Sequence, residues 1–272
     1  MPSESIGAQM FTLRDHCKTP ADIASTCKKL KDMGFDTIQA SAAGFNDIAA
    51  DELRKILDDT GLTCVATHKG LDWLQDVSQA VDWHKTVGCA LTAIGGFGAG
   101  KDGSSKADWQ AFIKAYNDLA PKLAAKGLKL GYHNHSHELS PFGLAENPAR
   151  IDPHDCPMQL LVDQTDPTVW FELDTYWIAH GGGDPAQWID KVAGRIPAIH
   201  VKDMTITPAR EQKMCEVGRG NLNWPRVIDA CRNAGVEYYL IERDKGDVDP
   251  FETLKISLEN LKAMGVGAAT MV

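Results

Sequence analysis

The chain has 272 residues, with 28 lysine and arginine residues against 37 aspartate and glutamate residues, which gives a formal net charge of −9. This acidic balance argues against a broad nucleic-acid-binding surface, because such a surface needs clustered basic side chains to neutralise phosphates. Hydrophobic residues make up 43% of the chain, which is enough for a large core and excludes a disordered protein.

The sequence carries no pattern that indicates a membrane or a secreted protein. The opening MPSESIGAQMF lacks a basic region followed by an apolar stretch, and no apolar run is long enough to span a membrane. The seven cysteines are scattered and form no CxxC pair, so we expect reduced thiols rather than disulfides or a cysteine zinc site. These features predict a cytoplasmic protein that does not bind membranes.

Short apolar runs rich in β-branched residues alternate with longer segments of helical periodicity from residue 6 onward. The runs that predict strands lie, in chain order, at residues 6–12, 37–41, 63–68, 90–96, 128–135, 169–177, 198–204 and 238–244. Several intervening segments begin on proline or aspartate and close on glycine, as helices do. Five glycines directly precede strands, where left-handed helix ends are expected: Gly34, Gly61, Gly88, Gly127 and Gly235.

This alternation predicts an α/β protein with one domain over residues 1–272, a (β/α)8 TIM barrel. An open doubly wound sheet is the alternative, but it would usually carry a glycine-rich phosphate loop after the first strand, where this chain has AQMFTLRD. The GGFGAG run at residues 95–100 follows the fourth strand and has no acidic partner at the expected distance. We therefore interpret it as a glycine-rich loop at the barrel rim.

Chemically capable side chains gather at the predicted C-terminal strand ends, where the catalytic residues of such barrels lie. From the third strand to the eighth, these are His68, the GYHNHSHEL run at 131–139, Glu172, Asp174, His200, Lys202, Glu242 and Asp244. Charged side chains in apolar strands are costly unless they are paired or bind a cation. The mixed set Asp174, His200 and Glu242 suits a divalent transition metal ion. A buried layer of ion pairs without a metal is the alternative.

The motifs FELDTYW, HVKDM, EVGRGNLNW and YYLIERD, together with AQMFTLRD, resemble the xylose isomerase-like TIM barrels. This superfamily includes D-tagatose 3-epimerase, inosose dehydratase and, more distantly, endonuclease IV. The resemblance implies one divalent metal ion, with Mn²⁺ expected first and Zn²⁺, Co²⁺ or Mg²⁺ as alternatives. Asp174, His200 and Glu242 match three of the four usual ligands. For the fourth we prefer Glu138, because the HxxE ending of the fifth strand resembles the epimerase pattern; His133 takes its place if the odd-numbered face of that strand points inward.

The same resemblance implies a sugar isomerase or epimerase that abstracts a proton next to the carbonyl of a keto-sugar or related polyol, through a metal-stabilised enediolate. A dehydratase or lyase of the inosose dehydratase or keto-glycoside type is the alternative, and the fifth-strand histidines favour it slightly because imidazole can assist a departing hydroxyl. An endonuclease IV-like nuclease would need more metal ligands and a basic surface. A sugar-binding module without catalysis would not need Asp174, His200 and Glu242.

The remaining roles follow from this scheme. We expect His133 or His135, together with Lys202, to transfer protons or stabilise an oxyanion. The residues expected to contact substrate are His68 and Glu216 at sugar hydroxyls, Trp177 against a sugar ring, and Arg14 and Arg219 at a phosphate or carboxylate. For His68 and Trp177, plain packing is the alternative. His137 is expected in solvent, the partner is expected to be a small sugar, and the chain is expected to form a dimer or tetramer.

Overall fold

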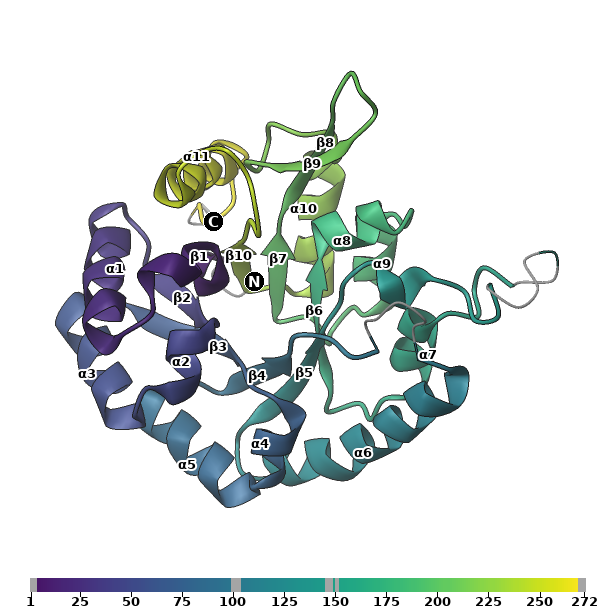
Figure 1. Ribbon diagram of the computed structural model, residues 1–272, viewed down its shortest axis with the longest axis horizontal. Helices are drawn as coiled ribbons and strands as arrows, with labels where there is room; N and C mark the ends of the chain where they lie inside the picture. Colours follow the sequence, from purple (N-terminus) through teal and green to yellow (C-terminus); the bar gives the residue numbers. More distant parts are fainter. Residues whose placement is uncertain (1–3, 99–103, 145–148, 150–151, 269–272) are drawn as a thin grey trace.

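The computed structural model describes residues 4–98, 104–144, 149 and 152–268. Eight parallel strands close into a barrel in the order β1-β10-β7-β6-β5-β4-β3-β2 (Figure 1). They are β1 (Ser5–Gln9), β2 (Thr37–Ala40), β3 (Thr63–His68), β4 (Leu91–Ile94), β5 (Lys129–His133), β6 (Trp170–Asp174), β7 (Ala198–Val201) and β10 (Tyr238–Ile241). The barrel closes where β1 pairs with β10, with Ala8 opposite Ile241. The predicted TIM barrel is confirmed.

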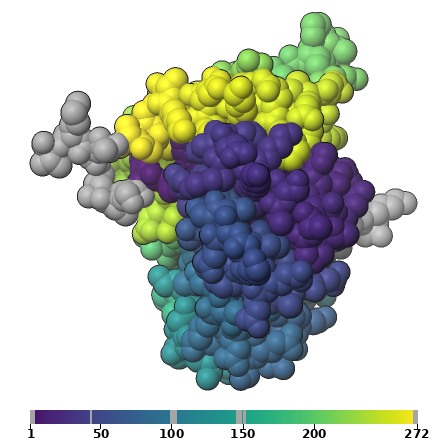
Figure 2. Space-filling model, turned by 90° about the vertical axis from the view of Figure 1, so that its left-hand side faces the viewer, coloured from purple at the N-terminus to yellow at the C-terminus, as the bar shows by residue number. Residues whose placement is uncertain are grey.

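Helices surround this barrel. The longer ones are α1 (Pro20–Asp32), α3 (Ala50–Thr60), α5 (Val77–Val87), α6 (Lys106–Ala124), α7 (Pro157–Gln164), α9 (Pro185–Lys191), α10 (Trp224–Ala234) and α11 (Pro250–Ala263). Short helices follow several strands: η1 (Met10–His16), α2 (Ala43–Asp47), α4 (Leu71–Gln75), η2 (His137–Leu139) and α8 (Thr175–His180). Figure 2 shows α11, in yellow, directly beside the purple N-terminal segments, so the first and last units of the chain meet. Within the described ranges, no helix is long and apolar enough to cross a membrane.

Capping residues explain where the helices begin and end. At the start of α1, the Thr19 hydroxyl accepts a hydrogen bond from the Asp22 backbone N–H, and the Asp22 carboxylate accepts one from the Thr19 N–H. The five glycines predicted at helix ends have φ between +67° and +94°. This left-handed conformation favours glycine because it has no Cβ. The predicted glycine helix ends are therefore confirmed.

Several strands end earlier than predicted, and for three of them the local structure gives the reason. The run 169–177 is a strand only as far as Asp174, because the Asp174 carboxylate accepts a hydrogen bond from the Trp177 N–H and starts α8. The run 6–12 turns into η1 after Gln9, whose side chain accepts a hydrogen bond from a backbone N–H of that helix. The run 198–204 is divided after β7, since its last residues begin a separate hairpin.

The hairpin of β8 (Asp203–Ile206) and β9 (Gln212–Cys215), which the sequence analysis did not predict, projects from the barrel at the top of Figure 1. Its first residue holds the following loop in place. Asp203 Oδ2 accepts hydrogen bonds from the Gly218 and Gly220 N–H groups at 2.9 and 3.0 Å and from Trp224 Nε1 at 2.7 Å. The HVKDM and EVGRGNLNW motifs therefore form one structural unit.

The inner face of the barrel is set by the alternation of side chains along its strands. On β5, Gly131 faces the inside of the barrel. The Trp170 side chain of the neighbouring strand β6 occupies the space beside it. A Cβ atom at residue 131 would lie only 2.3 Å from the indole Cε2 of Trp170. His133, two residues further along, shares this inward face. The odd-numbered face of the fifth strand therefore points into the barrel.

Candidate metal centre

Four side chains converge at the C-terminal ends of four neighbouring strands. His133 closes β5, Asp174 closes β6, His200 lies in β7 opposite Asp174, and Glu242 directly follows β10. Each offers one ligand atom, these atoms all lie within 4.8 Å of one another, and all four residues are buried. The predicted convergence of Asp174, His200 and Glu242 is thus present, with His133 as the fourth member. We call these four residues the quartet.

The quartet has ligand atoms without hydrogen bonds, which a bound cation would need. Asp174 Oδ2, His200 Nδ1, Glu242 Oε2 and both ring nitrogens of His133 are buried and have no hydrogen-bond partner among the described residues. His200 Nδ1 lies 2.9 Å from Glu242 Oε2 and 3.8 Å from Asp174 Oδ2, close contacts that lack hydrogen-bond geometry. Two of these atoms, Asp174 Oδ2 and Glu242 Oε2, contact the Lys202 ammonium at 2.9 and 2.8 Å. Buried polar atoms are rarely left without hydrogen bonds. Two imidazoles and two carboxylates in this state match the donor set of a divalent transition metal ion.

The other atoms of these side chains are fixed by neighbouring groups. His200 Nε2 lies 2.6 Å from Gln39 Oε1, and because an amide oxygen only accepts, Nε2 carries a proton and Nδ1 is the nitrogen that could bind a metal ion. Gln9 Nε2 donates to Glu242 Oε1 at 3.1 Å, which leaves Oε2 as the oxygen that lies close to His200. Such outer hydrogen bonds orient metal ligands. Gln9 and Gln39 were missed in the sequence analysis, although a glutamine inside each of two apolar strands was a signal.

Glu172 occupies the layer beneath the quartet and is fully hydrogen bonded. His68 Nε2 lies 2.5 Å from Glu172 Oε2, and Gln39 Nε2 donates to Oε1 at 2.8 Å. Burial would raise the pKa of Glu172, but His200 and His68 outweigh it, and the pKa lies well below its ordinary value. Although His68, Glu172 and His200 offer ligand atoms near one another, the hydrogen bonds already use these atoms. These three residues therefore offer no free set of ligand atoms for a second metal ion.

Lys202 lies against the quartet as a buried cation. Its Nζ atom is 2.9 Å from Asp174 Oδ2, 2.8 Å from Glu242 Oε2 and 3.0 Å from Asp244 Oδ1. Burial would lower the pKa of Lys202, but these three carboxylates outweigh it and raise the pKa above its ordinary value. Lys202 is therefore an ammonium group that can stabilise negative charge at the site.

Glu138 lies outside the quartet, and both of its carboxylate oxygens are occupied. Tyr132 donates its hydroxyl proton to Oε1 at 2.7 Å, and the His135 N–H donates to Oε2 at 2.9 Å. Burial raises the pKa of Glu138. The Tyr132 hydroxyl also accepts a hydrogen bond from the Phe97 N–H at 3.0 Å. Glu138 thus joins the end of β5 to the loop after β4, and the geometry favours His133 as the fifth-strand ligand.

A cavity of about 610 Å³ opens beside the quartet. It is lined by Gly95, Gly96, Phe97, Gly98, His135, Ser136, His137 and Trp177. The His135 ring lies between His133 and Trp177, with centroid distances of 5.0 and 5.3 Å, and burial lowers the pKa of His135 to about 3, so its imidazole is neutral. His137, which was expected in solvent, is half-buried, and its Nε2 lies 2.7 Å from the Phe97 carbonyl oxygen.

The part of the GGFGAG run that the structure describes, residues 95–98, forms a loop at the rim of this cavity. Residues 99 and 100 lie outside the described residues.

The other predicted substrate contacts lie elsewhere on the rim. Glu216 is buried and accepts hydrogen bonds from Arg243 Nη1 at 2.7 Å and from the Thr253 hydroxyl at 3.1 Å. Arg219 is exposed, and its side chain makes no hydrogen bond or ion pair with the described residues. Arg14 donates to two backbone carbonyls and, with Arg243 and Lys245, lines a separate cavity of about 230 Å³.

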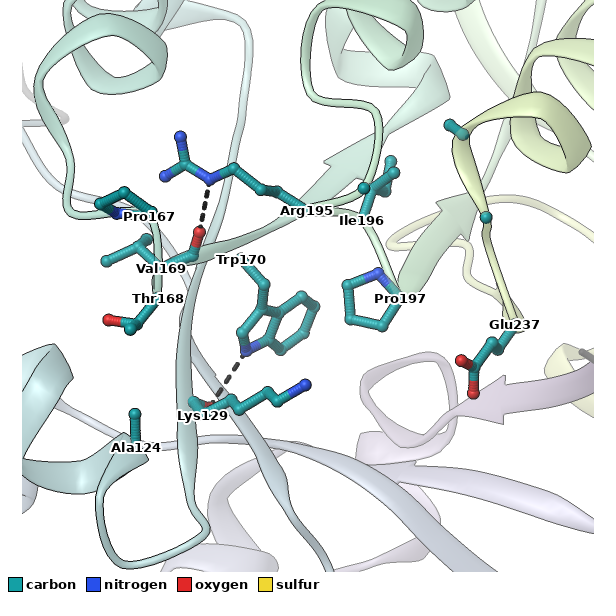
Figure 3. Close-up of a pocket in the computed structure, with 13 residues that line it drawn as sticks. Ala124, Lys129, Pro167, Thr168, Val169, Trp170, Arg195, Ile196, Pro197 and Glu237 are labelled. Carbon is teal, nitrogen blue, oxygen red and sulfur yellow. Dashed lines mark hydrogen bonds between the residues drawn. The ribbon is translucent and has the colours of Figure 1, made fainter.

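A further cavity, of about 320 Å³, lies at the opposite, N-terminal ends of the strands (Figure 3). Figure 3 shows the Trp170 indole donating to the Lys129 carbonyl oxygen and Arg195 donating to the Val169 carbonyl oxygen. No member of the quartet lines it. Residues at this end of a TIM barrel serve stability, whereas catalytic groups lie at the C-terminal end. The candidate site is therefore the quartet with its 610 Å³ cavity.

Residues 27–264 match the family described as xylose isomerase-like TIM barrel. The chain belongs to this family. A rhizopine catabolism protein, MocC, of Rhizobium meliloti is 25% identical to the chain over 178 residues, and an inosose dehydratase of Geobacillus thermodenitrificans is 28% identical over 163 residues. These matches cover 59% and 53% of this chain. They cover 51% of each relative, so the chain spans about half the length of the curated relatives it matches.

A solved structure of a sugar phosphate isomerase/epimerase from Parabacteroides distasonis superposes on this chain with a TM-score of 0.77. The two are 22% identical, and the match covers 97% of this chain and 95% of the other. This likeness shows the shared barrel fold.

Proposed function

We propose that the protein is a divalent-metal-dependent enzyme of the sugar isomerase/epimerase type. It would abstract a proton next to the carbonyl of a keto-sugar or related polyol. The observation that carries this proposal is the convergence of ligand atoms without hydrogen bonds from His133, Asp174, His200 and Glu242 at the C-terminal barrel end. Membership of a family that includes sugar isomerases and inosose dehydratases supports it.

The quartet would hold one ion, for which Mn²⁺ is our first expectation and Zn²⁺, Co²⁺ or Mg²⁺ the alternatives. A bound divalent ion supplies Lewis acidity, which polarises a substrate carbonyl and acidifies the neighbouring C–H group. Glu172 and His68 would support the site from below, since their hydrogen bonds hold each other and leave neither free to bind metal.

Two further side chains would act on the substrate directly. Lys202 would stabilise the negative charge that develops on the substrate oxygen, because its ammonium lies against both quartet carboxylates. His135 would move the proton, since its neutral imidazole lines the cavity next to His133. Trp177 would form one wall of the substrate site.

A dehydratase or lyase is the second candidate, and one observation favours it. The strand-5 member of the quartet is an imidazole instead of a carboxylate, so the fifth strand supplies no ligand carboxylate that could share proton transfers with Glu242. Imidazole is well suited to protonate a departing hydroxyl or glycosidic oxygen near neutral pH. A nuclease with several metal ions is disfavoured, because the neighbouring group of His68 and Glu172 is already hydrogen bonded.

Deuterium exchange tests the proposal. The metal-loaded protein is incubated in D₂O with a panel of keto-sugars and inososes, and each sugar is then examined by mass spectrometry. We expect incorporation of deuterium at a carbon next to the carbonyl, and loss of this exchange in Asp174→Asn. Exchange with an isomeric product indicates an isomerase or epimerase, and exchange with loss of water or an alcohol indicates a dehydratase or lyase. Absence of exchange across the panel would contradict enolisation.

A further inference from the structure

The cavity beside the quartet has the size and chemistry of a second binding compartment. Its volume of about 610 Å³ lies within the range of roughly 300–1,000 Å³ that is typical of sites for drug-sized ligands. None of the four quartet residues lines it. A substrate group that reaches the quartet would therefore leave this compartment available for a further part of the same molecule.

Two lining residues connect the compartment to the quartet. The His135 ring contacts the His133 ring on one side and the Trp177 ring on the other. Trp177 lies 5.5 Å, ring centroid to Nζ, from Lys202, which itself contacts Asp174. Side chains that contact the quartet therefore also line the cavity.

Glycine residues keep the compartment open on the side of the β4 loop. Gly96 has φ of +125°, which disfavours any other residue, and a Cβ there would lie 3.2 Å from His135 Nδ1. Trp177 also lines the cavity and is the one tryptophan among its lining residues. The flat ring of tryptophan suits a sugar ring, which presents C–H groups on its face.

The lining of this compartment offers no cationic side chain of lysine or arginine to a phosphate. It also contains no aspartate or glutamate. A negatively charged group would bind more favourably in the separate 230 Å³ cavity, which is lined by Arg14, Arg243 and Lys245. The group that enters the larger compartment is therefore uncharged.

We propose that the substrate carries a second, uncharged sugar ring, joined to the reacting ketose by a glycosidic bond, and that this ring binds over Trp177 in the compartment. This inference rests on the proposed function, which places the ketose carbonyl at the quartet. It names a glycosylated ketone as the substrate class and excludes a sugar phosphate from this side of the site.

Paired binding measurements test the inference. Isothermal titration calorimetry on the Mn²⁺-loaded protein compares D-fructose with two-ring ketoses that differ in linkage: turanose, lactulose and isomaltulose. We expect at least one two-ring ketose to bind about tenfold more tightly than fructose. If every two-ring ketose binds no better than fructose, including the case in which none binds, the inference is overturned.

Variants then assign the tighter binding to this compartment. Ser136 lines it and its side chain makes no hydrogen bond with the described residues, so Ser136→Tyr fills the space. The exposed Ser140→Tyr is the matched control. Trp177→Leu removes the flat ring, whereas Trp177→Phe keeps one. Ser136→Tyr and Trp177→Leu should abolish the tenfold preference for the two-ring ketose over fructose. Ser140→Tyr and Trp177→Phe should retain most of this preference. If the preference survives in Ser136→Tyr, the second ring binds elsewhere and the proposal is overturned.

The binding result and the deuterium-exchange result test the compartment and the proposed function separately. Deuterium exchange into a one-ring ketose, with no preference for two rings, would support enolisation and reject the second-ring compartment. A two-ring preference without exchange would support the compartment and reject the enolisation chemistry.

Discussion

The Nε2 atom of His200 donates a hydrogen bond to Gln39 Oε1 over 2.6 Å, and this contact aims Nδ1 at the other members of the quartet. The same glutamine donates to Glu172 through its amide nitrogen. One side chain on β2 thus fixes both the tautomer of a proposed ligand and the carboxylate beneath it.

Gln39→Met should therefore weaken metal binding without removing a ligand. We expect the dissociation constant for Mn²⁺ to rise about 10- to 100-fold, the usual effect of losing an outer partner of a metal ligand. Isothermal titration calorimetry measures it, and Gln79→Leu at an exposed position is the control. Equal affinity of Gln39→Met and the parent protein would show that His200 needs no such orientation.

Glu138 and His133 should differ sharply as metal ligands. Because both oxygens of Glu138 are used by Tyr132 and by the His135 N–H, we expect Glu138→Gln to leave Mn²⁺ affinity within about twofold and to cost roughly 1–3 kcal/mol of stability. His133→Asn should lower the affinity by at least about 100-fold, more than the loss of an outer partner. The reverse ranking of the two variants would make Glu138 the fourth ligand.

The barrel was predictable because its repeating signals are local. Helix caps, glycines before strands and apolar runs each act within a few residues, so they are legible in the sequence. The convergence of Asp174, His200 and Glu242 followed from this, since parallel strands bring their C-terminal ends to one rim.

The fifth-strand contribution could not be settled in the same way. Which face of β5 points inward depends on the Trp170 side chain beside Gly131, a contact between strands that are far apart in sequence. The roles of Gln9 and Gln39 depend likewise on hydrogen bonds across the barrel. The predicted end of β6 was too late in the chain. Asp174 is both a member of the quartet and the N-cap of α8, and the strand ends there because the helix begins.

The packing of Trp170 against Gly131 can be tested by adding one methyl group. Gly131→Ala places a Cβ 2.3 Å from the indole, so Trp170 or the backbone must move, and we expect a loss of about 1–3 kcal/mol. Gly70→Ala is the control, because nothing lies within 4 Å of a Cβ there and its φ is −66°; it should change stability by less than about 1 kcal/mol. Urea unfolding measures both, and equal losses would show that residue 131 is not tightly packed.

The buried His84 should make stability depend on pH. Its Nδ1 lies 2.6 Å from the Ala80 carbonyl oxygen and its Nε2 lies 2.8 Å from the Thr67 hydroxyl, and burial lowers the pKa of His84 from 6.5 to about 4. The unfolded state therefore binds more protons than the folded state between these values, and stability falls as the pH falls through this window. The contribution of His84 between pH 7 and pH 4 is on the order of 3 kcal/mol.

Urea unfolding at both pH values isolates this contribution. His84→Gln should reduce the loss of stability on acidification relative to the parent protein, whereas the exposed His154→Gln should not. If His84→Gln loses as much stability on acidification as the parent protein, His84 does not carry the effect.

Anomalous X-ray diffraction at the zinc absorption edge, from crystals soaked with Zn²⁺, tests the central claim most directly. The account predicts one strong peak at about 2.0–2.2 Å from a nitrogen of His133, His200 Nδ1, Asp174 Oδ2 and Glu242 Oε2. A peak bound by Glu138, or no peak between these four side chains, would contradict it.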